Sequence, residues 1–200
     1  MNSDSIVKIL ENASINSNYY TSDELNSITT IVLNKMSYDG AVLETDFNDL
    51  LKFPNLYNLT LNGFIIDNRL ISILLKIPGL RVLTLNNCEI IEYIYMSFSK
   101  LRLYELNLYN TNFNVSLLSN ELDKLILNNV EFGRFKAHVD KLDVCRCNIS
   151  NIKELLSCSF ETIIVSHDLY FSNQKSFDDC KKKVIVMEKD SMFVLRKVGF

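Results

Sequence analysis

Cysteine and histidine are the side chains of this sequence best suited to bind a metal. Cys145, Cys147 and Cys158 lie near one another along the chain, and the histidines are His138 and His167. Cys145 falls at a solvent-facing place of a repeated pattern and Cys147 at an inward place, so their thiols diverge. The sequence also has no CxxC pair, and a buried free cysteine behaves as a small apolar residue. We therefore interpret the cysteines as structural and predict no metal site and no cofactor.

The tripeptide Ser166-His167-Asp168 contains the residue types of a hydrolase triad. Residues adjacent in sequence cannot line up as nucleophile, base and orienting acid, and the chain has only 2 histidines for acid–base chemistry. Its 5 scattered glycines cannot build a Gly-rich phosphate loop. We predict that the chain is not an enzyme.

Composition limits the class of protein and of partner. With 200 residues, 48% of them hydrophobic and 22% charged, the chain is expected to be an ordered globular protein or repeat array. Its net charge of −3 gives no general attraction to nucleic acid or anionic membranes. The sequence shows neither a secretory signal nor an apolar run of about 18 residues that could span a membrane. An odd number of cysteines, 5, then predicts reduced thiols and a cytoplasmic protein, with the nucleus also possible.

The strongest pattern is a short unit that recurs along the chain. In Leu80–Ile90, apolar residues occupy the first, fourth, sixth and eleventh places, with Cys88 at the ninth. The first place of successive copies holds Ile28, Leu56, Leu80, Leu103, Leu122, Val139 and Phe160. A degenerate further copy is expected at Lys181–Met187, with Val184 and Val186 pointing inward.

This spacing has a direct structural meaning. The fourth and sixth places are two residues apart, so their side chains leave the same side of a strand and enter the core. One unit cannot cover its own apolar row, so neighbouring units must stack with their strands parallel. The sequence therefore predicts a repeat array whose stability is a sum over neighbouring units.

The unit resembles that of the leucine-rich repeat family, Leu-x-x-Leu-x-Leu-x-x-Asn/Cys-x-Leu, over residues 25–187. The resemblance implies an α/β fold: a leucine-rich repeat solenoid with a parallel β-sheet on the concave face and short helices or turns on the convex face. The stretch Phe64–Leu80 looks like the cysteine-containing subtype, which is common in substrate-recognition subunits of ubiquitin ligases. Cys88 and Cys147 fill the Asn/Cys place, but the other copies have neither residue there, which predicts an irregular solenoid.

Helices and turns are expected between the strands. Apolar positions and caps predict four helices. The first is at Ser3–Asn12, and the second carries Phe47, Leu50 and Leu51. The third is capped by Asp67 or Asn68 and carries Leu70, Ile71, Leu74 and Leu75, and the fourth is at Ile91–Ser99. Asn151 and Glu154 form a predicted capping box. The segments after Phe113 and Phe132 are too short for more than a turn of helix, and Lys181–Lys183 reads as a solvated edge.

This reading divides the chain into three parts. Residues 1–24 form an N-terminal helical cap and loop, residues 25–180 a leucine-rich repeat array, and residues 181–200 a C-terminal capping β-hairpin. The hairpin is expected to close the last edge of the sheet.

The outward places of the strands hold the candidate binding residues, because the resemblance implies a ligand face on the concave sheet. The candidates are Tyr57, Arg81, Tyr104, Glu105, Asn107, Tyr109, Asp143 and Arg146. Tyrosine and arginine are enriched in interface hot spots, but exposed strands also accept tyrosine on propensity alone, and we weigh the two readings equally. For the asparagines at the seventh and eighth places we favour a structural role in the bend where each strand ends.

These observations predict a non-catalytic protein–protein interaction scaffold, a monomer that binds a protein partner on its concave face. The cysteine-containing subtype suggests an alternative, the substrate-recognition subunit of a ubiquitin-ligase-type complex. Against it, residues 1–27 show no F-box-like Leu-Pro run. A thiol-based ligase would need a second domain, for which the remaining residues leave no room.

Overall fold

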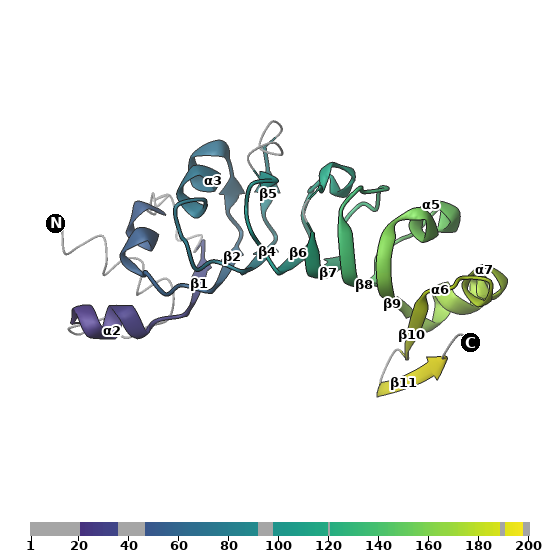
Figure 1. Cartoon of the computed structure of the whole chain (residues 1–200). Coiled ribbons are helices and arrows are strands. Elements are labelled where there is room, and N and C mark those ends of the chain that lie inside the picture. Colours follow the sequence, from purple (N-terminus) through teal and green to yellow (C-terminus); the bar gives the residue numbers. More distant parts are fainter. Residues whose placement is uncertain (1–20, 36–46, 92–97, 120, 189–190, 198–200) are drawn as a thin grey trace. The chain divides into compact units, whose positions relative to one another are not determined.

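The computed structural model describes residues 21–35, 47–91, 98–119, 121–188 and 191–197 (Figure 1). The chain divides into two compact units, Met1–Arg102 and Leu103–Phe200, which we call the first and second unit. The predicted helix Ser3–Asn12 and most of the predicted helix Ile91–Ser99 lie outside the described residues, and the division into cap, array and hairpin stays a prediction. The described helices are all too short or too polar to cross a membrane.

In the first unit, three strands lie parallel and in register: β1 (Thr30–Asn34), β2 (Asn58–Asn62) and β4 (Val82–Asn86). Their paired side chains form two rows, Ile31, Leu59 and Leu83 in one and Leu33, Leu61 and Leu85 in the other. Each of these side chains is at most 1% exposed. The fourth and sixth places of the repeat are thus the buried rows that the sequence predicts.

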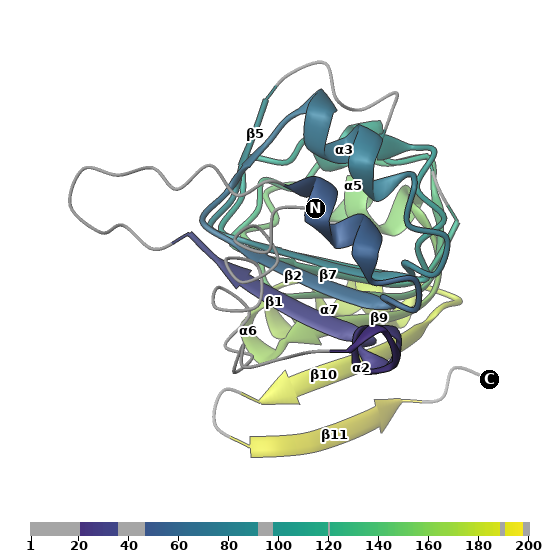
Figure 2. The same ribbon diagram turned by 90° about the vertical axis from the view of Figure 1, so that its left-hand side faces the viewer.

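Short elements connect these strands: α2 (Ser22–Ser27), the 3₁₀-helix η1 (Phe47–Lys52), α3 (Asn68–Leu74), and a small parallel sheet of β3 (Ile65–Ile66) and β5 (Glu89–Ile90). Figure 2 shows α3 on one side of β1 and β2. Asp67 is the cap of α3, because its Oδ1 accepts the N–H of Leu70 at 2.8 Å. Of the apolar residues that indicated these helices, Leu51 and Leu75 are each 39% exposed. With three residues per turn, η1 buries Leu50 and turns Leu51 outward, and Leu75 follows the last residue of α3.

In the second unit, five strands lie parallel: β6 (Glu105–Tyr109), β7 (Leu122–Asn128), β8 (His138–Arg146), β9 (Ser159–Ser166) and β10 (Lys183–Glu188). The fourth-place row of buried side chains is Leu106, Leu125, Leu142, Ile163 and Val184. The degenerate copy that ends at Met187 is therefore a real repeat, and β11 (Ser191–Lys197) pairs antiparallel with β10. Both units share the predicted α/β fold class, a leucine-rich repeat solenoid of parallel strands and short helices or turns.

The connections of the second unit are η2 (Val115–Leu117), α5 (Ile152–Ser157), α6 (His167–Ser172) and α7 (Gln174–Asp178). The short 3₁₀ turn after Phe113 confirms the prediction for that segment. At α5, Asn151 accepts the N–H of Glu154 at 3.2 Å, but Oε1 of Glu154 accepts the N–H of Arg134 at 2.9 Å. Half of the predicted capping box is therefore replaced by a bond to the preceding repeat.

Lys182 departs from the predicted solvated edge. Its Nζ donates to the carbonyl oxygens of Leu156 (3.0 Å) and Cys158 at the end of α5, and it lies 3.7 Å from the centroid of the Phe160 ring. Burial lowers the pKa of the Lys182 amine. A cation at this position stabilises the last carbonyls of a helix, so Lys182 is part of the fold.

Several strands end in a bend with left-handed backbone. Gly63, Asn87, Asn110 and Asn129 have φ of 80°, 51°, 50° and 51°. Glycine and asparagine accept this conformation more readily than other residues. In the second unit, Nδ2 of Asn129 also donates to Oδ1 of Asn110 at 2.9 Å. The structural role predicted for the asparagines is confirmed at these three positions.

Candidate partner-binding face

The face opposite the buried rows is formed by the third, fifth and seventh places of each repeat, because side chains alternate along a strand. Together with the second- and eighth-place residues at the two ends of each strand, we call it the outer face, and we describe it separately for each unit. Its side chains are half-buried or exposed in most strands, as in the half-buried Asn58, Thr60 and Asn62 of β2. Two of the predicted binding residues belong to the first unit and six to the second.

In the first unit, Tyr57 and Arg81 lie side by side at the starts of β2 and β4. The N–H of Arg81 donates to the carbonyl oxygen of Tyr57 at 2.9 Å. The guanidinium of Arg81 donates through Nη1 to the carbonyl oxygens of Pro78 (3.0 Å) and Leu80 (2.7 Å). Arg81 is thus held against its own turn, next to a tyrosine that is 45% exposed.

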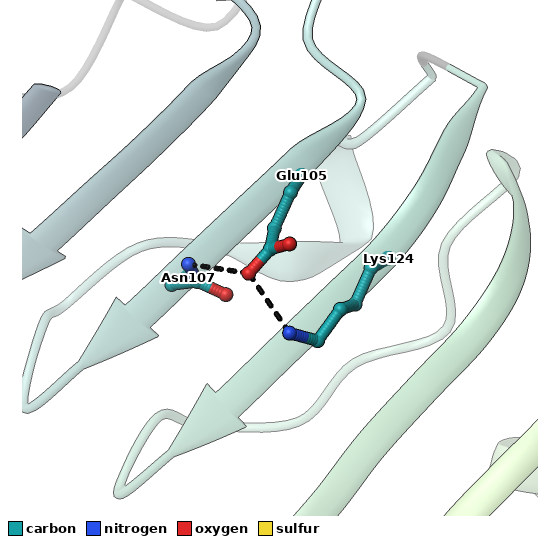
Figure 3. Close-up of polar contacts among 3 residues, drawn as sticks. All are labelled: Glu105, Asn107 and Lys124. Atoms are coloured by element: carbon teal, nitrogen blue, oxygen red, sulfur yellow. Dashed lines mark hydrogen bonds and ion pairs between the residues drawn. The ribbon is translucent and has the colours of Figure 1, made fainter. Parts of the chain in front are cut away.

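In the second unit, Glu105, Asn107 and Lys124 form a network across β6 and β7 (Figure 3). Oε1 of Glu105 accepts from Nδ2 of Asn107 at 3.0 Å and from Nζ of Lys124 at 2.9 Å. Asn107 is only 7% exposed, so it offers a partner little surface. Tyr104, just before β6, is 51% exposed.

The other three predicted residues, Tyr109, Asp143 and Arg146, line one hollow of about 850 Å³ on the outer face of the second unit. The hollow lies at the C-terminal ends of β6 to β10 and the start of α6. Its remaining lining residues are Ile126, Leu127, Asn128, Cys145, Ser166, His167, Asp168 and Met187.

A β-bulge shapes this hollow. Ile126 pairs with Asp143, whereas Asn128, two residues on, pairs with Arg146, three residues on, so β8 has one extra residue here. Oδ1 of Asp143 accepts the N–H of Cys145 at 3.0 Å within the bulge. Because a bulge re-aims the residues that follow it, both Cys145 and Arg146 line the hollow beside Asp143.

Three residues of the hollow, Cys145, Ser166 and His167, are of types that serve as nucleophile or base in enzymes, and the structure shows the local interactions of each. Burial, together with the nearby carboxylate of Asp143, raises the pKa of the Cys145 thiol to about 12, so the thiol stays protonated at neutral pH. Oγ of Ser166 accepts the N–H of Leu169 at 3.3 Å and so caps α6. The ring of His167 packs on Phe171, with 4.3 Å between the centroids.

Sequence reasoning missed the hollow as a unit. It placed Tyr109, Asp143 and Arg146 on one face but could not group them, because the bulge and the start of α6 at His167 depend on neighbouring strands. The seventh-place column, which runs Tyr109, Asn128, Cys145 and Ser166, is the sequence signal that could have indicated it. Met187 completes the lining from the degenerate repeat.

Comparison with protein-family models found no match, and comparison with curated proteins found no significant match. Among solved structures, the crystal structure of an internalin from Listeria monocytogenes is similar to this chain. The identity is 24% and the TM-score 0.46, over 82% of this chain and 55% of that chain. This chain therefore spans about half the length of that protein. The repeat architecture is shown by the chain's own strand register and buried rows.

Proposed function

We propose that this chain is a non-catalytic interaction module that binds a protein partner on the outer face of its parallel sheet. The observation that carries the proposal is the exposure of Tyr57 and Tyr104, 45% and 51%, directly before the strands β2 and β6. The core is formed by the buried rows and does not include these two rings. Tyrosine and arginine are the residue types that most often anchor protein interfaces.

The cellular setting is part of the same proposal. The module acts as a monomer in the cytoplasm or nucleus, with its cysteines as free thiols. The ubiquitin-ligase alternative rests on the resemblance to the cysteine-containing subtype alone and stays a prediction. Recovery of ligase adaptor proteins with this chain would support that alternative.

The test needs an identified partner and a pair of matched variants. Affinity capture from native lysate identifies candidates, and the dissociation constant of each purified candidate is then measured by calorimetry. Tyr104→Ala/Arg81→Ala removes two outer-face side chains. Ile65→Ala/Leu117→Ala removes two apolar side chains of similar exposure, 47% and 46%, that lie in β3 and η2, away from the outer face.

We expect the Tyr104→Ala/Arg81→Ala variant to bind the partner at least about 10-fold more weakly, as for the loss of a hot-spot residue. The Ile65→Ala/Leu117→Ala variant should keep the affinity of the wild type. If the first variant folds, as judged by circular dichroism, and binds with unchanged affinity, the outer face is not the binding surface.

A further inference from the structure

The hollow of the second unit has a chemistry that indicates what enters it. Resting on the proposed function, we propose that the hollow receives one basic side chain, a lysine or an arginine, from the protein partner. Asp143 is the residue that would pair with it, and Ile126, Met187 and Tyr109 would surround its stem.

Asp143 stands in an apolar row. In the fifth-place register of the second unit, Asp143 pairs with Ile126 on one side and Ile164 on the other, and Ile164 pairs with Ile185. Ile164 is 8% exposed, and Asp143 itself is half-buried. A carboxylate flanked by aliphatic side chains has lost part of its hydration, and a cation is the partner that restores the lost interaction best.

The chain itself does not supply that cation. Among the described residues, the carboxylate of Asp143 accepts the N–H of Cys145, and no lysine or arginine nitrogen lies within 4.0 Å of it. Glu105 on the same outer face shows the contrast, because Nζ of Lys124 lies 2.9 Å from its Oε1. The fold therefore neutralises one outer-face carboxylate and leaves the other for a ligand.

The net charge of the lining agrees with a single cation. Two carboxylates, Asp143 and Asp168, and one guanidinium, Arg146, line the hollow, and Asp168 also lies 3.7 Å from Nδ1 of His167. Counted formally, without the imidazole, the lining carries two negative charges against one positive. One added lysine or arginine side chain brings the sum to zero. An acidic side chain would meet both carboxylates, and an apolar one would cover Asp143 without pairing it.

The apolar lining fits the stem of such a side chain. Lysine and arginine lay their methylene groups along apolar surface while the charged group reaches a polar partner. Ile126 and Met187 offer that surface, and the ring of Tyr109 is a face on which a cation can rest. A volume of about 850 Å³ also leaves room for the partner backbone on either side of the basic residue.

The test uses the full ¹⁵N-labelled chain and four capped tripeptides, acetyl-Gly-X-Gly-amide, with X arginine, lysine, glutamate or norleucine. Backbone amide shifts of Cys145 and Arg146 report occupancy, because the Cys145 N–H is bonded to Asp143. We expect the arginine and lysine peptides to bind with millimolar affinity, at least about 10-fold more tightly than the glutamate and norleucine peptides.

Three variants separate the charge from the surroundings. Asp143→Asn keeps an acceptor for the Cys145 N–H and should remove the preference for the basic peptides. Glu105→Gln changes the other outer-face carboxylate and should leave the preference intact. Arg146→Gln removes the positive charge of the lining and should strengthen binding of the arginine peptide about twofold or more.

Several results would overturn the inference: equal binding of the norleucine and arginine peptides, no binding of either basic peptide, or an unchanged basic preference in Asp143→Asn. The affinity of the same variants for the whole partner distinguishes failure of this inference from failure of the proposed function. If Tyr104→Ala/Arg81→Ala weakens partner binding and Asp143→Asn does not, only the hollow has been misassigned. If the peptides behave as expected but the double variant keeps full partner affinity, the proposed face is wrong.

Discussion

Asn110 and Asn129 show how single residues set the ends of the strands in the second unit. Both have left-handed backbone, and their side chains bond to each other. Their N–H groups donate to the carbonyl oxygens of Asn128 (2.9 Å) and Arg146 (3.0 Å) in the next repeat. The sequence indicates the column of asparagines, but only the structure shows which of them pair.

Replacing Asn129 tests the role of backbone conformation. Asn129→Val should lower the free energy of unfolding by about 1–2 kcal/mol more than Asn129→Gly, because a β-branched residue resists positive φ and glycine does not. Both variants lose the bond to Asn110, so their difference isolates the backbone. Urea denaturation measures it, and equal losses in the two variants would show that the conformation is not what selects asparagine here.

Cys145 should be an unreactive thiol in the folded chain. With its pKa raised from 9.0 to about 12, the thiolate fraction at pH 8 is about 1000-fold lower than that of an unperturbed cysteine. Alkylation by iodoacetamide, followed at the Cys145 peptide by mass spectrometry, should be slower by a similar factor. The rate should increase steadily as the pH rises toward the raised pKa.

The same residue in concentrated urea is the control, because unfolding removes both the burial and the proximity of Asp143. Similar alkylation rates in folded and unfolded chain would mean that Cys145 is neither buried nor close to the carboxylate.

At the scale of elements, two adjacent leucines at the C-terminal end of α3 differ in exposure. Leu74 is 1% exposed and faces the core, whereas Leu75 is 39% exposed. Leu74→Ala should lower the free energy of unfolding by about 2–5 kcal/mol, and Leu75→Ala by about 1 kcal/mol or less. Thermal and urea denaturation of the two variants measure this difference. Equal losses would mean that α3 buries a different face.

The elements also show where sequence reasoning succeeds. The strands were predictable because a period of two places Leu59 and Leu83, or Leu106 and Leu125, on one side of each strand. The bulge in β8 was not predictable, because it is defined by pairing with β7 and not by local composition. The hydrogen bond of the Glu154 carboxylate was not predictable either, because its donor is the N–H of Arg134, 20 residues away in the sequence.

At the scale of the whole molecule, the outer face differs between the two units. The paired outer places of β2 and β4 are uncharged, with asparagine, threonine and valine, whereas those of β6 to β8 include Glu105, Lys124, Lys141 and Asp143. The buried rows are alike in both units, so these differences are not required by packing. The outer face is therefore where this chain can differ from other repeat proteins of the same fold, and where recognition should be encoded.

The central claim, that a protein partner binds on the outer face, is tested most directly by hydroxyl-radical footprinting of the wild-type chain with and without the purified partner. Mass spectrometry then gives the oxidation rate of individual side chains. We predict that Tyr104, Tyr109 and Met187 become protected severalfold, while Leu75 and Leu117, which are exposed but lie outside the outer face, keep their rates. Protection of Leu75 and Leu117 with unchanged rates at the three outer-face residues would contradict the claim.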